Sequence, residues 1–349
     1  MTGKSRKVEF LYLNQDEVVQ CGALDMAMVM ERIEHLFTLH ENRETIVPDK
    51  IALRWGDAAS EAVTGRINAM PGYVGGDVDT AGIKWIGSKP MNPSNYGLPR
   101  ASALTILNDP ETGFPVAVMD GTVISAMRTG AVTGVAAKHL ARRDSKRAAF
   151  IGAGTQNHTQ LLAVTTAVPD IEEIHICDIS AERVEAFLET ETAKHPGRSL
   201  QGTTSAEEAV RGADIIVTAT TSLKPIVKAD WIKPGVFLAN VGNYEFEFEA
   251  VEAADKIVVD NWEAVIHRGI QTVAIVVNEG RMNRDRLHAE LGEITSGKKA
   301  GRENNMETIY FCAVGMGAED IIVGRRIYEE AVNRGIGTWL TLWNNPVWI

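Results

Sequence analysis

The sequence predicts an α/β protein in which a doubly wound parallel sheet is inserted into a second, α+β domain. After residue 147, near-continuous apolar strands alternate with helices, which is typical of a parallel sheet. Residues 50–120 contain short strands with tight turns, which indicates a mostly antiparallel sheet. An amphipathic helix after residue 310 is long enough to return to that first sheet. We therefore expect one domain from residues 1–125 and 312–349, and another from residues 126–311.

The first domain is expected to open with a helix over residues 16–40, which Asp16 can cap and in which apolar residues recur on one face. Five strands should follow, with an Asp-Pro turn in NDPETG before the last. These strands are KIALRW, GRINAM, AGIKWIGS, ASALTIL and FPVAVM. Residues 122–141 predict a helix whose many small residues permit close approach of another backbone or a ligand.

The inserted domain is expected to contain five buried strands with helices between them. The strands are KRAAFIGAG, EIHICDI, ADIIVTATT, GVFLANVG and DKIVVD, and the first two helices are NHTQLLAVTTAV and SAERVEAFLET. We see no internal repeat and no long linker.

Composition excludes several classes of function. Acidic residues outnumber basic ones by 46 to 35, and a net charge of −11 argues against general binding of nucleic acid or an anionic membrane. A local pocket for a small anion stays open. Three scattered cysteines and the spacing of the eight histidines support neither a disulfide framework nor a metal site. With no signal peptide pattern and no long apolar run, we expect a cytoplasmic protein.

The strongest motif is AAFIGAGTQN, where a strand runs into Gly152-Ala153-Gly154 and a helix begins. Gly152 allows the tight turn, and Gly154 lets a pyrophosphate approach the helix N-terminus. The third glycine of the usual fingerprint is replaced by Asn157. Asp178 ends the next strand, where an acid accepts the ribose hydroxyls of NAD and repels a 2′-phosphate. The pattern predicts NAD rather than NADP, although Arg183 could meet a phosphate.

Other residues of this domain are candidate cofactor contacts by their position. In open α/β sheets ligands bind at the carboxyl ends of strands, so TATTS (218–222) and NVGN (240–243) should line the nicotinamide side. Ordinary turn chemistry is the alternative for each of them. The further candidates are Thr155, Gln156, Ile179, Thr218, Ala219, Thr220, Val241 and Gly242.

Two cations of the first domain need partners. Lys84 lies in mid-strand within AGIKWIGS, and Arg128 lies among small residues in SAMRTGA. Both are costly to bury unless they are paired. A substrate carboxylate could pair both, with the arginine giving bidentate recognition. Internal salt bridges explain the pattern equally well.

In combination, these segments resemble the ornithine cyclodeaminase/μ-crystallin family over roughly residues 15–338. The matching motifs are MPGY (70–73), GIKWIG (82–87), GLPRASALTILNDPETGFPVAVMDG (97–121), MRTGAVTGVAAKHLARRDSKRAAFIGAGTQ (127–156) and AELGEITSGKKAGR (289–302). The resemblance implies a homodimer of two-domain subunits. One domain is a Rossmann fold that binds NAD(P), and the other, formed by both chain ends, carries the substrate contacts and the dimer interface.

The resemblance also implies roles for individual residues. The family's chemistry is hydride transfer between the α-carbon of an amino acid and nicotinamide, through an imine. Lys84 matches the substrate lysine and could exchange a proton with the α-nitrogen or a water, and Arg128 matches the carboxylate-binding arginine. The family's other arginine falls on Lys50 or Arg54. Thr129 and Gly130 would face the cofactor. The candidate substrate contacts are Lys50, Arg54, Met70, Lys84, Arg128 and Tyr244, with Lys84, Arg128 and Glu245 as the catalytic set.

The fifth strand departs from the pattern of ornithine cyclodeaminases. Their aspartate, which binds the distal amine, falls on Tyr244, with Glu245 beside it. Either Glu245 replaces the aspartate, or the side chain that is recognised is not an aminoalkyl group. Three functions stay open: an amino-acid dehydrogenase or imine reductase with a small anionic substrate, a redox-neutral ornithine cyclodeaminase, and a non-catalytic cofactor-binding protein.

The segment TWLTLWNNPVWI lies beyond the shared part of the family. It holds three of the seven tryptophans. We expect this apolar tail to be buried, either on the substrate domain or across a dimer.

Overall fold

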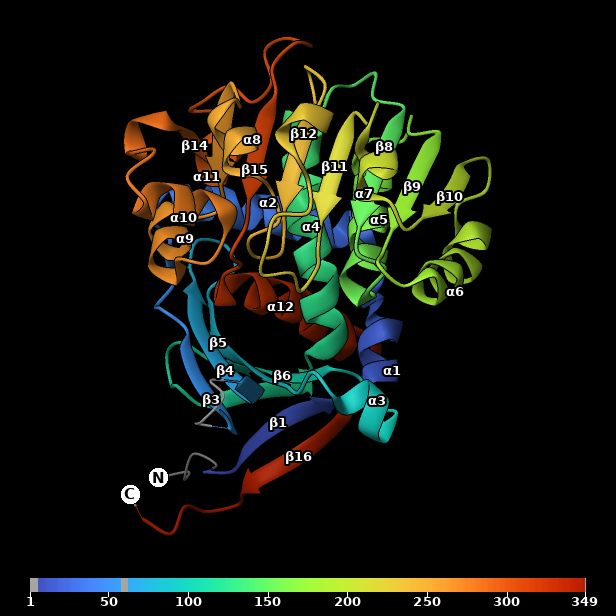
Figure 1. Cartoon of the computed structure of the whole chain (residues 1–349). Coiled ribbons are helices and arrows are strands. Elements are labelled where there is room, and N and C mark those ends of the chain that lie inside the picture. The colour runs from blue at the N-terminus through green and yellow to red at the C-terminus, as the bar shows by residue number, and fades with distance from the viewer. Residues whose placement is uncertain (1–5, 58–61, 349) are drawn as a thin grey trace. The chain divides into compact units, whose positions relative to one another are not determined.

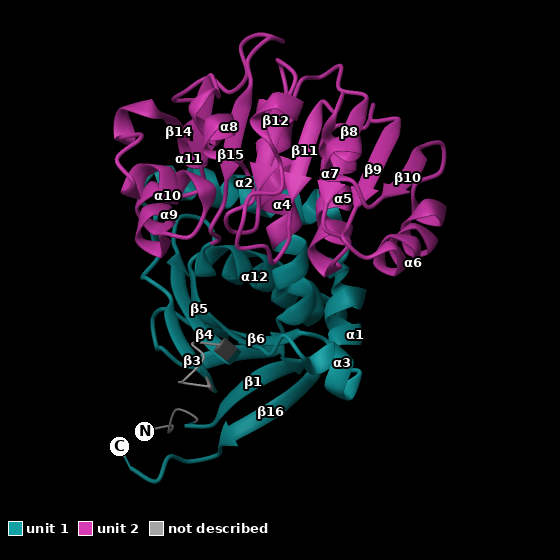
Figure 2. Ribbon diagram, in the orientation of Figure 1, with its two compact units in different colours: residues 1–128, 316–349 teal, residues 129–315 magenta. Residues whose placement is uncertain are grey.

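The computed structural model describes residues 6–57 and 62–348, and the chain divides into two compact units. Unit 1 comprises residues 1–128 and 316–349, and unit 2 comprises residues 129–315 (Figure 2). The boundaries expected from the sequence lie a few residues earlier in each case. The first division falls inside helix α4 (Thr122–Leu140).

Unit 1 is built on one eight-stranded sheet with the order β16-β1-β7-β6-β5-β4-β2, in which β3 also pairs with β4. All of its pairings are antiparallel except that of β1 with β7. The five strands predicted for this region are all present. The strands are β1 (Val8–Leu13), β2 (Thr45–Ile46), β3 (Ile51–Asp57), β4 (Ala62–Val74), β5 (Thr80–Ser88), β6 (Ala101–Asn108), β7 (Pro115–Asp120) and β16 (Thr338–Trp343).

The prediction of a single helix over residues 16–40 is wrong. Gly22 takes a positive φ of 98°, which breaks the helix, and Asp25 caps the part that follows. The first part is capped by Asn14 in a capping box with Glu17, so Asp16 is not the cap. The helices of unit 1 are α1 (Gln15–Val18), the π-helix η1 (Val19–Ala23), α2 (Met26–Glu41), α3 (Asn92–Tyr96), α12 (Gly317–Arg334) and the first part of α4.

The two faces of this sheet differ in burial. Strand alternation sends Lys84 to one face, where it is 1% exposed, and Trp85 to the other, where it is 41% exposed. Strand register places a set of exposed apolar side chains on the face of Trp85, and we call this set the apolar face. Its members are Tyr12, Ile51, Leu53, Trp55, Trp85, Leu104, Leu340 and Leu342.

The C-terminal tail forms strand β16, but the described part of it is not buried within one chain, which corrects half of the expectation. Strand β16 pairs with β1, so that Trp339 lies opposite Leu11, and Trp343 packs edge-on against Phe114. Trp339 is nevertheless 54% exposed and Trp348 80% exposed. The reason is that β16 is the edge strand of its sheet. Burial across a dimer is the remaining alternative.

Unit 2 contains a parallel eight-stranded sheet with the order β10-β9-β8-β11-β12-β15-β13-β14 (Figure 1). The chain moves outward from β8 to β10 and then starts again on the other side of β8, which is the doubly wound arrangement predicted. The strands are β8 (Arg147–Ile151), β9 (Glu173–Cys177), β10 (Ser199–Thr203), β11 (Ile215–Thr218), β12 (Phe237–Asn240), β13 (Lys256–Val259), β14 (Leu287–Glu290) and β15 (Ile309–Cys312). The α-helices include α5 (Thr155–Ala167), α6 (Ala181–Glu191), α7 (Ala206–Val210), α8 (Phe248–Glu252), α9 (Trp262–Arg268), α10 (Thr272–Asn278) and α11 (Leu291–Thr295).

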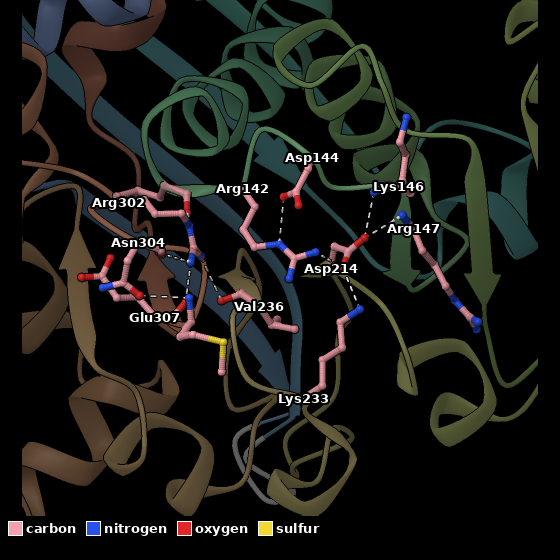
Figure 3. Close-up of polar contacts among 12 residues, drawn as sticks. Arg142, Asp144, Lys146, Arg147, Asp214, Lys233, Val236, Arg302, Asn304 and Glu307 are labelled. Carbon is pink, nitrogen blue, oxygen red and sulfur yellow. Dashed lines mark hydrogen bonds and ion pairs between the residues drawn. The ribbon is translucent and has the colours of Figure 1, made fainter.

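The buried carboxylate of Asp214, just before strand β11, accepts hydrogen bonds at the amino end of the neighbouring strand β8. Asp214 accepts hydrogen bonds from the backbone N–H groups of Lys146 and Arg147 and from Arg142, and it pairs with Lys233 at 2.6 Å (Figure 3). Burial opposes its ionisation, but Lys233 and the backbone donors outweigh that cost and lower the pKa of Asp214. Arg302 has a separate set of contacts in the same view and donates to the carbonyl oxygens of Leu140, Val236, Asn304 and Glu307 (Figure 3).

Within the described part of the chain, no helix has the length and apolar character needed to cross a bilayer.

Candidate functional site

The glycine-rich turn in unit 2 has the conformation that the sequence predicts for it. Gly152 adopts a φ of +104°, and a Cβ there would lie 2.9 Å from the carbonyl oxygen of Ala219. Its N–H donates to the carbonyl of Cys177 at 2.6 Å. Only glycine fits this position without strain, because the conformation and the close approach both exclude a side chain.

Room for an anion lies at Gly154, the N-cap of α5. A Cβ there would meet no atom within 4 Å, and no side chain caps the helix. Thr155 and Gln156 form the first turn, so their N–H groups belong to the set that has no partner inside a helix. These observations fit a pyrophosphate. Asn157 replaces the third glycine and is buried, and its amide donates to the carbonyls of Ile151 and Gly152, which holds the turn from below.

Asp178 stands at the carboxyl end of β9 beside this turn. Its two carboxylate oxygens accept hydrogen bonds from the N–H groups of Ala153, at 2.9 Å, and Ser180, at 3.0 Å. Ile179 is 97% exposed and gives an apolar surface next to the carboxylate. Arg183 is exposed in the first turn of α6. The arrangement fits an adenosine ribose whose hydroxyls bind to Asp178. Arg183 lies five residues further along the chain.

The carboxyl ends of β11 and β12 meet on the other side of β8. The N–H groups of Val241 and Gly242 donate to the carbonyl of Thr218, and the N–H of Ala219 donates to Ile151. The structure therefore brings together the segments 218–220 and 241–242 with the glycine turn, as the strand pattern predicts.

Glu245 is completely buried beneath these segments. Its Oε2 accepts from Thr218 Oγ1 at 2.7 Å, Asn240 Nδ2 at 2.8 Å and Gly242 N at 2.9 Å, while Oε1 accepts from Thr220 N at 2.6 Å. Burial raises the pKa of Glu245, and these donors oppose the rise. A carboxylate with four protein donors is held by its surroundings, which favours a positioning role over the catalytic role predicted for it.

Tyr244 does not share that environment. Its ring stacks on Phe248 with centroids 5.1 Å apart, and the side chain remains partly exposed. The position onto which the resemblance places the cyclodeaminase aspartate thus carries a stacked aromatic ring. Its substrate-binding role stays a prediction.

In unit 1, Lys84 is buried between the sheet and its covering helices. Its Nζ lies 2.7 Å from Asp320 Oδ2 and 3.3 Å from Ser125 Oγ. Burial and the nearby Arg128 cation lower the pKa of Lys84 to about 8, against the opposing effect of Asp320. A lysine of this kind can release or take up a proton near neutral pH.

Arg128 pairs with Glu319, which precedes Asp320 on helix α12. Its Nη1 contacts Glu319, and its Nε lies 3.2 Å from Asp320 Oδ2. Both cations singled out from the sequence are thus opposed by carboxylates, so the cluster of Lys84, Arg128, Glu319 and Asp320 contains two charges of each sign. The cluster therefore carries no net charge, whereas the sequence left open a local pocket for a small anion.

Sequence reasoning missed Glu319 and Asp320. The signal that could have found them is the segment GAEDIIVG, in which two acids stand in the first turn of a helix amid small and apolar residues. Both acids are completely buried. Asp320 Oδ1 has no hydrogen-bond partner among the described residues, so the cluster retains unused acceptor capacity.

The other predicted substrate contacts lie on the strands beside β5. Met70 is paired with Lys84 in the register of β4 and β5, and Lys50 immediately precedes β3. Arg54 is exposed on β3 opposite Arg66. Burial and the charges of Arg100 and Arg54 lower the pKa of Arg66, which indicates that three arginines gather there. The substrate-binding roles of Lys50 and Arg54 both stay predictions.

Small residues in α4 serve helix packing in unit 2. A Cβ on Gly130 would lie 2.5 Å from the carbonyl of Thr159 on α5, and the carbonyl of Thr129 accepts from Gln160 at 3.2 Å. This contact accounts for the glycine without a ligand. The predicted cofactor contact of Thr129 stays a prediction. Within the described ranges, no group of acidic, histidine or cysteine side chains could hold a metal ion.

Comparison with known proteins identifies relatives along almost the entire chain. The model of the ornithine cyclodeaminase/mu-crystallin family matches residues 16–335. An N-((2S)-2-amino-2-carboxyethyl)-L-glutamate dehydrogenase of Staphylococcus aureus is 36% identical, over 96% of this chain and 99% of the relative.

Two solved structures superpose on the chain with a TM-score of 0.86 each. One is a Thermococcus litoralis Δ1-pyrroline-2-carboxylate reductase in complex with NADH and L-proline, 38% identical, with 94% of this chain and 99% of that one covered. The other is an archaeal alanine dehydrogenase dimer with bound NAD, 35% identical, with 96% and 100% covered.

Proposed function

This chain belongs to the ornithine cyclodeaminase/mu-crystallin family, and we propose that it transfers a hydride between NAD and the α-carbon of an amino acid whose side chain carries no amine. The protein is an NAD-dependent oxidoreductase of the amino-acid and imine class. The observation that carries the choice of side chain is Glu245. Its carboxylate is buried and engaged by four donors, and Tyr244 occupies the aspartate position, so no free acid is offered to a distal amine.

The residues of unit 2 fit NAD. The turn at Gly152 and Gly154 would hold the pyrophosphate and Asp178 the adenosine ribose, and when bound the cofactor supplies or accepts the hydride. The exposed apolar Ile179 beside Asp178 would support the adenine.

The ion cluster of unit 1 supports a substrate that carries both signs of charge. An amino acid or an iminium carboxylate has one carboxylate for Arg128 and Lys84, and one N–H group for an acceptor such as Asp320 Oδ1. Lys84 could also pass a proton to or from the α-nitrogen or a water, because burial and Arg128 bring its pKa to about 8. The alternative function is a redox-neutral cyclodeaminase, which would need an acidic group to bind the distal amine of ornithine.

The proposal is tested by following NADH absorbance with product identification. Δ1-Pyrroline-2-carboxylate, and pyruvate with ammonia, should each be offered with NADH, and L-proline, L-alanine and N-((2S)-2-amino-2-carboxyethyl)-L-glutamate with NAD⁺. We expect stoichiometric consumption of one nicotinamide per product with at least one of them. Formation of proline from ornithine with only trace NAD⁺ and no net NADH would overturn the proposal in favour of a cyclodeaminase.

Lys84→Met separates an enzyme from a binding protein. We expect turnover to be lost while NADH still binds, since Lys84 lies in unit 1 and the glycine turn in unit 2. The matched control is Lys89→Met, on the same chain segment but outside the ion cluster. Unchanged turnover in Lys84→Met would remove this lysine from the mechanism.

The apolar face of unit 1 supports a homodimer. Eight large apolar side chains share one exposed sheet face, which is uncommon for a protein that acts alone. A second copy of the chain is the occupant that we propose, because a relative of the same fold is a dimer.

We also propose that the reaction takes place in the cytoplasm. Cys21, Cys177 and Cys312 are free and buried, which is consistent with a reducing compartment.

Light scattering during size exclusion tests the dimer. Trp85→Glu should shift a dimeric mass to a monomeric one, whereas Leu223→Glu, at an exposed site of unit 2, should leave it unchanged. A monomeric wild type, or a Trp85→Glu variant that stays dimeric, would contradict the use of this face.

A further inference from the structure

Three neighbouring strands of unit 2 are joined at their carboxyl ends by one side-chain network. Tyr310 on β15 donates its hydroxyl to Asn240 Oδ1 at 2.6 Å, and Asn240 on β12 donates its amide to Glu245. Glu245 in turn accepts from Thr218, the last residue of β11, and from the N–H of Thr220 beyond it. The network runs through side chains that are fully buried.

The carboxylate of Glu245 is specifically required by its neighbours. Both backbone partners, the N–H groups of Thr220 and Gly242, can only donate, one to each carboxylate oxygen. An amide in place of the carboxylate would turn an NH₂ group toward one of them, leaving a buried donor unpaired. The fit is also close in space, since a Cβ on Gly242 would lie 2.5 Å from the carboxylate carbon of Glu245.

The strand order says which half of a dinucleotide these segments face. The glycine turn follows β8, and Asp178 follows β9 on one side of it. The segments 218–220 and 241–242 follow β11 and β12 on the other side. A dinucleotide with its pyrophosphate at the turn and its adenosine at Asp178 must extend its other half over β11 and β12.

We propose that Glu245 is a positioning residue that fixes the segments 218–220 and 241–242 in the shape that receives the nicotinamide half of the cofactor. This inference rests on the proposed function, because it takes NAD as the ligand of unit 2. It replaces proton transfer by Glu245 with a role exerted through backbone groups.

The test compares two ligands that share the adenosine half. Glu245→Gln should weaken NADH binding about tenfold while changing the affinity for 5′-AMP less than about twofold, both measured by calorimetry on the full-length protein. The emission of bound NADH should also move toward that of free NADH, because the nicotinamide loses its fixed surroundings. Glu249→Gln is the matched control, since Glu249 is exposed and pairs with Arg281 on the surface. It should leave both affinities and the emission unchanged.

A second variant keeps the test decisive if Glu245→Gln does not fold. Tyr310→Phe removes only the hydroxyl that orients Asn240, and we expect a smaller loss of NADH affinity in the same direction, again without an effect on 5′-AMP. Equal weakening of NADH and 5′-AMP, or no change in either variant, would overturn the proposal. If the wild-type protein bound neither 5′-AMP nor NADH, the proposed function itself would fail instead.

Discussion

Lys84 Nζ lies 2.7 Å from Asp320 Oδ2, and both side chains are buried although 236 positions separate them in the chain. The pair joins the middle of strand β5 to the first turn of α12. The unit 1 cation that the sequence singles out is thus held by a carboxylate from the C-terminal segment.

The rate of imine reduction should fall as the pH rises through about 8. Burial and Arg128 lower the pKa of Lys84 to about 8, so the ammonium that would pair with the substrate carboxylate is lost above that pH. The measurement is kcat/KM against pH for the wild type and for Lys84→Arg. Because an arginine stays protonated, the variant should lack this decline in whatever activity remains. A wild-type profile without a decline near pH 8 would contradict the assignment.

Asp320→Asn should lower the free energy of unfolding by about 3–5 kcal/mol, because it leaves the buried Lys84 ammonium without its counter-ion. It should also lower the pKa of Lys84 further, since Asp320 is a group that raises it. Urea denaturation measures the first effect. Glu329→Gln on the same helix breaks only an exposed pair with Arg325 and should cost less than about 1 kcal/mol. Equal losses in the two variants would show that the buried pair is not special.

Asp178→Ala should weaken NADH binding and reduce discrimination against NADPH. The carboxylate that would accept the ribose hydroxyls is removed, and with it the charge that repels a 2′-phosphate. We expect roughly a tenfold loss of NADH affinity, or about 1.4 kcal/mol, measured by fluorescence titration with both nucleotides. Glu182→Ala, in the first turn of α6, is the control. An unchanged ratio of the two affinities would count against Asp178 as the selective group.

Asp214→Asn should destabilise the protein at neutral pH, and the difference from the wild type should shrink in acid. The pKa of Asp214 in the folded state lies below its ordinary value of 3.8, so the carboxylate stabilises the fold above that pH and stops doing so as the pH falls further. We expect a loss of about 3 kcal/mol at pH 7, from urea denaturation at several pH values. Asp144→Asn, at an exposed partner of Arg142, should have little effect. A difference that persists undiminished in acid would rule out this linkage.

Local pattern was sufficient for much of unit 2. Each of the five predicted strands is present, and the turn at Gly152 has the positive φ that its sequence predicts. Three further strands were missed. Strands β10 (SLQGT) and β14 (LHAE) are short edge strands with polar residues, and β15 (IYFC) is only four residues long. The break of the first helix at Gly22 was missed because apolar periodicity continues across it.

Contacts between distant segments were beyond the sequence. Nothing near Lys84 or Arg128 in the chain announces Glu319 and Asp320, and the choice between a substrate carboxylate and internal salt bridges therefore stayed open. In the same way, the position of Glu245 beside Tyr244 suggested a reactive acid. Only the folded sheet shows that its carboxylate turns inward onto the ends of β11 and β12.

The sequence by itself determined the fold class, the family and the place of the dinucleotide turn, because periodicity, glycine conformation and short motifs act over a few neighbouring residues. The tertiary structure decided which charges oppose one another and which apolar surfaces remain exposed. Those outcomes depend on which side chains the fold buries. Burial lowers the pKa of Lys84, and four donors surround the buried Glu245 carboxylate, while Trp85 and Trp339 remain exposed on unit 1. Burial is set by segments that meet only after the chain has folded.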